Sequence, residues 1–209
     1  MSTQRIILLA FTATIAILGS MFFIDVPLAN FIHSLETPWL RSTGMVLEEL
    51  GKSHWVLGYC ILTIAIAWRS MRDVAHRHIE FFLSVAISGI AANIIKVIAC
   101  RPRPILMLTE SITQWDPLAF RMEYLWNSFP SGHATTGLAI AISGSAAWPR
   151  LRWFFWPLGI AIAVARMIVD AHYLSDVIAG AVLGAMVAIT LRSARVMTRF
   201  ESEERRRAA

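Results

Sequence analysis

Six apolar runs, separated by short polar segments, follow one another along this chain. They cover residues 6–24, 54–68, 81–100, 131–148, 153–169 and 174–191. The first run contains no charged residue, and at 1.5 Å per residue a helix of its length nearly crosses the roughly 30 Å hydrocarbon core of a bilayer. The pattern predicts an all-α integral membrane protein, a bundle of six transmembrane helices formed by one domain over residues 1–209.

The segments around these runs carry their own signals. A cleavable signal peptide is the alternative for the first run, but the run is long and no small-residue cleavage site follows it, which favours a retained span. Residues 26–50 alternate apolar and polar side chains in a helical rhythm, broken at Pro27, Pro38 and Gly44. They predict one or two short amphipathic helices at the membrane interface.

Two further connections are expected to be loops. Residues 69–79 predict a compact polar loop, and residues 105–129 a mixed loop whose aromatic side chains suit a membrane surface. Pro102 and Pro104 end the third run, because proline lacks the amide hydrogen and clashes with the preceding turn. The residues after the sixth run, rich in Glu and Arg, predict a frayed or solvated helix end.

Composition narrows the class of protein. Hydrophobic residues make up 56% of the 209 and charged residues 16%, against about 25% charged residues in soluble domains. This excludes an ordinary soluble domain and a disordered chain. The formal net charge of +5 can indicate nucleic-acid binding, but in so apolar a chain membrane topology explains it better. Cys60 and Cys100 form no disulfide framework and no metal-binding spacing.

Basic residues also orient the bundle. With six spans, both termini lie on one side, which carries twelve of the 19 Lys and Arg residues. Lys and Arg collect on the cytoplasmic side, so we expect cytoplasmic termini and an opposite, periplasmic face. The remaining seven basic residues on that face need another explanation. They are Arg41, Lys52, Lys96, Arg101, Arg103, Arg121 and Arg166.

Two of these basic residues lie near the ends of apolar runs. An ionised Lys96 or Arg166 there costs several kcal/mol unless it is paired or solvated, so both are candidate functional groups. The alternative for each is a side chain that reaches to the interface.

Pro130-Ser131-Gly132-His133 opens the fourth run. The free backbone amides and dipole of a helix N-terminus attract anions. Ser131 can cap the helix, Gly132 allows close approach of a ligand, and His133 is a suitable proton donor. By itself, this tetrapeptide is also an ordinary helix start.

His172 and Asp176 stand four residues apart at the start of the sixth run, so we expect them on one helix face. A carboxylate on one imidazole nitrogen leaves the other as nucleophile or base. The alternative is an interfacial histidine beside an N-terminal aspartate that the helix dipole favours.

These groups share the predicted outer face. The cations Lys96, Arg103 and Arg166 suit the equatorial oxygens of a phosphoryl group during transfer. One histidine can then attack while the other protonates the leaving oxygen.

Three spaced motifs extend this pattern. They are Lys96, six residues, Arg103-Pro104; Pro130-Ser131-Gly132-His133; and Ala165-Arg166, five residues, His172, three residues, Asp176. The sequence resembles the membrane branch of the type 2 phosphatidic acid phosphatase superfamily, which has these motifs in this order. The family's serine before the arginine is Ala165 here, which removes a hydrogen bond but no catalytic group.

The resemblance implies a role for each residue. His172 would be the nucleophile that forms a phosphohistidine, Asp176 would orient it, and His133 would be the general acid. Lys96, Arg103, Ser131, Gly132 and Arg166 would bind the phosphate. No metal and no cofactor is expected. Arg101 is a candidate for a contact with the substrate headgroup.

The substrate expected at a membrane boundary is a lipid phosphate or pyrophosphate. Family-level candidates are undecaprenyl pyrophosphate, phosphatidylglycerol phosphate, phosphatidic acid and lipid A phosphates. The expected setting is the bacterial inner membrane with the site facing the periplasm, a lipid substrate, no nucleic acid, and a monomer or weak dimer. Two other classes stay open: a phosphotransferase that uses the same phosphohistidine, and a non-catalytic lipid-binding or transport protein.

Overall fold

The computed structural model describes residues 3–208, and helices make up every regular element in that range. The elements are α1 (Thr3–Gly19), η1 (Ser20–Ile24), α2 (Asp25–Ser34), α3 (Pro38–Leu50), α4 (Ser53–Ala67), α5 (Arg72–Ala99), α6 (Pro104–Glu110), η2 (Tyr124–Trp126), α7 (Gly132–Ala147), η3 (Pro149–Leu151), α8 (Arg152–Ile168) and α9 (Leu174–Ala208). The all-α prediction is therefore confirmed for these residues.

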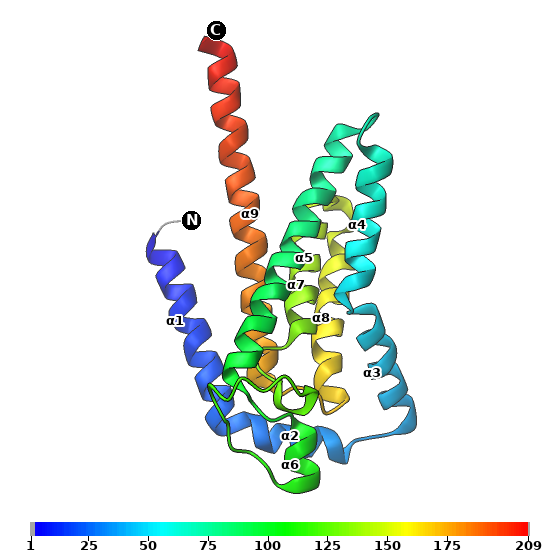
Figure 1. Cartoon of the computed structure of the whole chain (residues 1–209), viewed down its shortest axis with the longest axis vertical. Helices are drawn as coiled ribbons and strands as arrows, with labels where there is room; N and C mark the ends of the chain where they lie inside the picture. Colours follow the sequence, from blue (N-terminus) through cyan, green and yellow to red (C-terminus); the bar gives the residue numbers. More distant parts are fainter. Residues whose placement is uncertain (1–2, 209) are drawn as a thin grey trace.

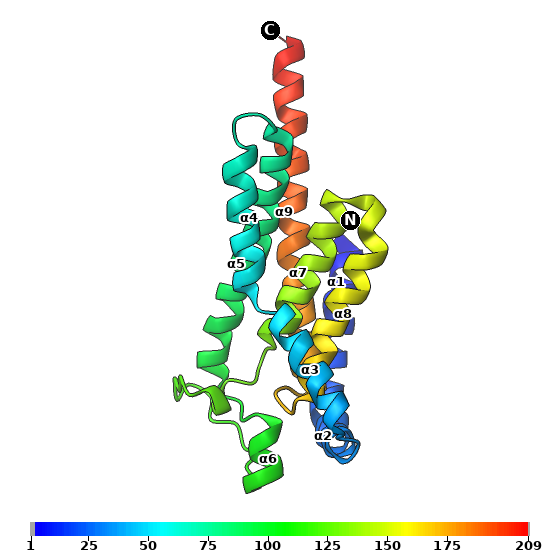
Figure 2. The same ribbon diagram turned by 90° about the vertical axis from the view of Figure 1, so that its right-hand side faces the viewer.

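The helix α7 forms the centre of the bundle. It packs against α5, α8 and α9, while α4 covers α5 and α3 lies along α8 (Figure 1). The helix α1 contacts α9, and α2 turns across the base of the bundle (Figures 1 and 2). The outer ends of α1 and α9 both point away from that base (Figure 1).

Glycines allow α7 and α9 to approach closely. A Cβ atom on Gly180 would lie 2.3 Å from the carbonyl oxygen of Ser131, and one on Gly184 would lie 2.2 Å from that of Thr135. Any larger residue would push the helices apart. The Gly-x-x-x-Gly pattern of α9 thus packs inside the bundle, and it fixes the start of α7 next to the start of α9.

Large apolar side chains point outward from many helices. Phe11, Phe22, Phe23 and Trp153 are each more than 60% exposed. Within residues 3–208, five helical stretches are long and apolar enough to cross a membrane: Ile7–Ser34, Pro38–Ala67, Arg72–Glu110, Pro149–Ile168 and Leu174–Ala194. The predicted fourth span corresponds to α7, whose 16 residues make it shorter than these stretches. The predicted count of six is thus not confirmed by helix length.

Three predicted connections differ from the structure. The polar segment 69–79 is mostly helical, because α5 begins at Arg72 and extends the apolar run by about two turns. Residues 105–129 include most of α6 and all of η2. Residues 26–50 do form helices, but Pro27 lies in the first turn of α2, where proline is tolerated, and Gly44 lies inside α3. The break falls at residues 35–37 instead.

Candidate active site

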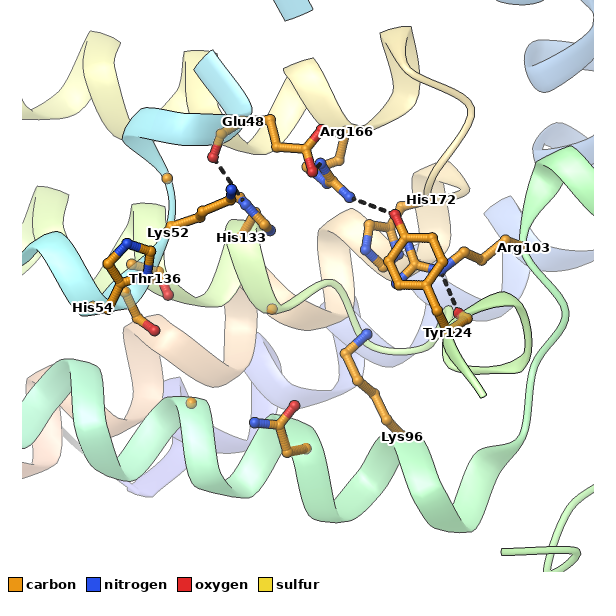
Figure 3. Close-up of a pocket in the computed structure, with 15 residues that line it drawn as sticks. Glu48, Lys52, His54, Lys96, Arg103, Tyr124, His133, Thr136, Arg166 and His172 are labelled. Atoms are coloured by element: carbon orange, nitrogen blue, oxygen red, sulfur yellow. Dashed lines mark hydrogen bonds and ion pairs between the residues drawn. The ribbon is translucent and has the colours of Figure 1, made fainter. Parts of the chain in front are cut away.

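A pocket of about 380 Å³ opens near the base of the bundle. Side chains from α3, α5, α7, α8 and the turn before α9 converge on it (Figure 3). Six of the predicted site residues line this pocket: Lys96, Arg103, Gly132, His133, Arg166 and His172. The structure thus brings together, across 77 positions of sequence, the residues that the three motifs single out.

Main-chain carbonyl groups hold two of the cations in place. The Lys96 Nζ donates to the carbonyl oxygens of Asn127 at 2.7 Å and Ser128 at 3.2 Å. The Arg103 Nε donates to the carbonyl oxygen of Tyr124 at 2.7 Å, and its guanidinium lies 3.6 Å from the centre of the Tyr124 ring. Neither contact neutralises the charge, so both cations are fixed and available to an anion.

Arg166 presents unsatisfied donors to the pocket. Its side chain is 2% exposed, and among the described residues its Nε and Nη1 have no aligned hydrogen-bond acceptor. Its Nη1 does lie 2.6 Å from the Glu48 Oε1, a close charge contact with poor hydrogen-bond alignment. A buried guanidinium with an unpaired Nε, and with Nη1 held only by this carboxylate, suits an anion with several oxygens that could replace Glu48.

The start of α7 is anchored to the start of α9. The backbone N–H of Ser131 donates to the carbonyl oxygen of Asp176 at 2.9 Å. The Ser131 Oγ caps α7 by accepting from the N–H of Ala134 at 3.3 Å, so this hydroxyl serves the helix and does not line the pocket. Gly132 does line it, and a Cβ there would meet only the Lys96 Cε, at 3.9 Å. The helix N-terminus therefore lies open to a ligand.

His172 lies in the turn before α9, two residues ahead of Leu174, and not on the helix as predicted. Its Nδ1 is 3.4 Å from the Ser128 Oγ and 3.6 Å from the Asp176 Oδ2. The same Asp176 oxygen accepts from the Ser128 Oγ at 2.5 Å and from the Tyr173 N–H at 2.9 Å. Ser128 and Asp176 thus flank one ring nitrogen, which leaves Nε2 as the nitrogen free to react.

The environment of His172 keeps its imidazole neutral. Burial is the largest cause that lowers its pKa well below the usual value, and the positive charges of Lys96 and Arg103 lower this pKa further. A neutral imidazole retains the lone pair that nucleophilic attack requires.

The second histidine faces the same pocket from α7. The Nε2 of His133 lies 3.0 Å from the main-chain carbonyl oxygen of Glu48, which fixes the proton on that nitrogen (Figure 3). That single N–H is already donated to the carbonyl oxygen, so His133 can act as an acid only in its imidazolium form, with a second proton on Nδ1.

Comparison with known proteins assigns a family to this chain. The family model described as the PAP2 superfamily matches residues 77–199, more than half of the chain. This chain belongs to the PAP2 superfamily. The matched residues include every group just placed in the pocket except Glu48, which lies outside that range.

Relatives and solved structures place this PAP2 protein among membrane phosphatases. The chain is 30% identical to proteins named lipid A 1-phosphatase from Rhizobium johnstonii and Rhizobium etli, over 81% of this chain and 72% and 76% of theirs. Its fold resembles LpxE from Aquifex aeolicus, with a TM-score of 0.63, 20% identity and coverage of 82% of this chain and 96% of that one.

A second solved structure has the same fold. It is a transmembrane PAP2-type phosphatidylglycerolphosphate phosphatase from Bacillus subtilis, with a TM-score of 0.64, 17% identity and coverage of 91% of this chain and 96% of that one. Together with the apolar helices, these likenesses show a multi-pass membrane phosphatase of PAP2 type.

Arg101 lies apart from the other predicted residues of this PAP2 site. Arg101 is 4% exposed and does not line the pocket. Its guanidinium instead contacts Asp25 at 2.7 Å and Asp176 at 2.5 Å. The structure therefore pairs Arg101 with two carboxylates and not with the pocket, and the expected headgroup contact stays a prediction.

Sequence reasoning missed Ser128, Tyr124 and Glu48. Ser128 is buried beside His172, and Tyr124 contacts both Arg103 and Arg166 (Figure 3). Ser128 lies two residues before the Pro130 motif, which was a usable signal. Glu48 had no signal, because it lies more than 100 residues from Arg166 in sequence.

A group that could bind a metal lies outside this pocket. The ligand atoms of His33, Glu36 and Asp170 lie within 4.8 Å of one another, and the His33 Nδ1 bonds the Asp170 Oδ2 at 2.8 Å. Burial raises the pKa of Asp170, and the bond with His33 opposes this shift. Because the cluster does not line the pocket, we assign it no part in the phosphate chemistry.

Glu48 occupies the position of an anion on Arg166, so an incoming phosphate has to displace it. We expect Glu48→Gln to lower KM by about 2- to 5-fold, the size of a partly exposed ion pair. The measurement is steady-state phosphate release by detergent-solubilised protein. Glu36→Gln is the matched control, since Glu36 pairs with Arg41 outside the pocket. A higher KM in Glu48→Gln would mean that Glu48 assists binding.

Proposed function

We propose that this PAP2 phosphatase hydrolyses the 1-phosphate of lipid A through a phosphohistidine on His172. One observation supports the chemistry above all: a neutral, buried histidine faces a pocket that also holds three cations and a second histidine, His133. Lys96, Arg103 and Arg166 would hold the equatorial oxygens of the phosphoryl group.

The proposed reaction has two steps. First, the lone pair of the His172 Nε2 forms a bond to phosphorus, the bond from phosphorus to the lipid oxygen breaks, and His133, which starts the step as imidazolium, gives its Nδ1 proton to that oxygen and becomes neutral. Water then attacks phosphorus, its proton passes to His133, and the N–P bond breaks with return of its electron pair to Nε2. The products are the dephosphorylated lipid and inorganic phosphate. No metal takes part in either step.

The relatives support lipid A as the substrate. The two curated proteins at 30% identity are both named lipid A 1-phosphatase, whereas the solved phosphatidylglycerolphosphate phosphatase is only 17% identical and supports the fold alone. Undecaprenyl pyrophosphate, phosphatidylglycerol phosphate and phosphatidic acid thereby become comparison substrates. Transfer of the phosphoryl group to a second lipid would use the same residues, and the assay below separates it from hydrolysis.

We also propose six spans, with α7 as the short central one, and cytoplasmic termini. The arrangement of the basic residues supports this orientation. The outer ends of α1 and α9 point away from the base where the pocket lies (Figure 1), so the pocket would face the periplasm of a bacterial inner membrane.

The test is phosphate release by the purified full chain in detergent, with EDTA present and one lipid at a time. We expect stoichiometric inorganic phosphate from lipid A carrying a 1-phosphate, and at least about 10-fold lower kcat/KM with the three comparison lipids. A preferred lipid other than lipid A would overturn the substrate assignment. Loss of activity with EDTA would contradict the metal-free steps, and phosphorylated acceptor without free phosphate would indicate a transferase.

A further inference from the structure

A second charged cluster lies behind the active site. The Arg101 guanidinium bridges two carboxylates, with its Nη2 at 2.7 Å from the Asp25 Oδ2 and its Nη1 at 2.5 Å from the Asp176 Oδ1. These three residues come from α2, the segment after α5, and α9, and each is at most 4% exposed. Salt bridges this deeply buried are uncommon and require complete pairing.

Several contacts hold this cluster rigid. Asp25 accepts from the Ser175 N–H at 2.9 Å and from the Ser175 Oγ at 2.5 Å. The Arg101 guanidinium lies between two aromatic rings, 4.8 Å from that of Trp115 and 4.2 Å from that of Tyr173. Arg101 therefore has one fixed position, in which it shares its charge between the two carboxylates.

The charges in the cluster have a consequence for His172. Arg101 and Asp176 alone would form a neutral pair, and a neutral pair offers little stabilisation to the positive charge that develops on His172 when its nitrogen bonds phosphorus. Asp25 adds a second negative charge. With it, the buried set of two carboxylates and one guanidinium carries a net charge of −1 beside His172.

From this geometry we infer that Asp25 is a positioning residue of the active site, which acts through Arg101 to keep Asp176 effectively negative beside His172. The inference rests on the proposed phosphohistidine chemistry. Asp25 touches neither the pocket nor the reacting atoms, and it lies 151 positions from Asp176 in sequence. It therefore affects the chemical step and leaves phosphate binding, which belongs to Lys96, Arg103 and Arg166, unaltered.

A purely structural role predicts different behaviour. Asp25 also ties α2 to α9 through Ser175. If that were its entire role, its removal would lower stability, and removal of Arg101 as well would lower stability further. In contrast, if Asp25 acts through its charge, kcat should recover when Asp25→Asn and Arg101→Gln are combined. In that double variant, Asp176 is again an isolated negative charge beside His172.

The test compares Asp25→Asn, Asp25→Asn/Arg101→Gln and Asp170→Asn in the full-length protein in detergent. We expect Asp25→Asn to lower kcat by about 10- to 100-fold with KM changed less than about 2-fold, the scale of one charge a few ångströms away in a partly shielded interior. The double variant should regain most of the lost kcat. Asp170→Asn is the matched control, a buried aspartate that also contacts α2 but bonds His33; its kcat should stay within about 3-fold of wild type.

Vanadate separates this inference from the substrate assignment. Vanadate forms a bond to a histidine nucleophile, so its dissociation constant reports the reactivity of His172, whereas that of inorganic phosphate reports the cations. Both are measured by thermal-shift titration, which also checks that each variant is folded. We expect Asp25→Asn to weaken vanadate binding by at least about 10-fold and phosphate binding by less than about 2-fold.

Each outcome bears on the inference. Wild-type kcat and wild-type vanadate affinity in Asp25→Asn would overturn it, and so would a folded double variant no better than Asp25→Asn. If Asp25→Asn does not fold, a folded double variant with less than a tenth of the wild-type kcat would also overturn it. Weaker vanadate binding in Asp25→Asn, in a protein that releases no phosphate from lipid A, would support the inference while the substrate assignment fails. A wild type that binds no vanadate overturns the inference and the phosphohistidine chemistry on which it rests.

Discussion

We expect His172→Ala to lower kcat by about 10³-fold or more while the protein stays folded and still binds phosphate. The loss follows because the imidazole is the proposed nucleophile, and removal of a nucleophile leaves only the stabilisation that binding groups provide. Lys96, Arg103 and Arg166 do not depend on His172 for their positions, since carbonyl groups and Tyr124 hold them. The measurement is phosphate release from lipid A in detergent.

The control for this variant is His76→Ala. His76 is exposed on α5 and lies edge-on to the Trp68 ring, outside the pocket. Its replacement should leave kcat within about 2-fold of wild type, as for an ordinary surface position. A His172→Ala variant that keeps more than about a tenth of the wild-type kcat would remove His172 from the reaction, because a nucleophile contributes far more.

We expect His133→Gln to lower kcat by about 10²- to 10⁴-fold with the lipid substrate, the range of a general acid. Glutamine can place its Nε2 near that of the histidine and donate to the Glu48 carbonyl oxygen, but it cannot transfer a proton, so the pocket keeps its shape. With p-nitrophenyl phosphate the leaving group needs no proton. The rate of the first step, in which the bond to the leaving group breaks, should therefore fall by less than about 10-fold in this variant. The measurement is the burst of p-nitrophenolate in rapid mixing.

Equal losses with both substrates would contradict the role of His133 as an acid. Such a result would place His133 in binding or in the architecture of the pocket. The apparent melting temperature of each variant, with and without inorganic phosphate, separates these cases, because a binding defect also lowers the shift that phosphate produces.

The sequence predicted the site better than it predicted the cluster behind it. Lys96, His133 and His172 carried signals of their own, since charged or titratable groups at the ends of apolar runs are rare without a function. Asp25 directly follows the first apolar run, where it marks the end of that run, and Glu48 lies in an amphipathic stretch, so neither pointed to a partner. Only the fold brings Asp25 to Arg101 and Glu48 to Arg166. Contacts between residues so distant in sequence cannot be read from local pattern.

The predicted helix ends were wrong where charged residues form part of a helix. Residues 69–79 were expected to form a loop because several are charged, yet residues 72–79 form the first turns of α5. Hydropathy reports the part of a helix that suits a membrane, while backbone propensity lets the helix continue beyond it. The same distinction explains α6, an amphipathic turn of helix that begins at Pro104, a favourable first helical residue.

The central claim is that His172 carries the phosphoryl group between lipid and water. It is tested most directly by mixing the wild-type protein with lipid A, quenching at alkaline pH within one turnover, and locating the added phosphoryl group by tandem mass spectrometry. We predict one phosphoryl group on His172 in the wild type and none on any residue of His172→Ala. A protein that releases phosphate from lipid A while the group is found on another residue, or on none at any time before turnover is complete, would contradict the mechanism.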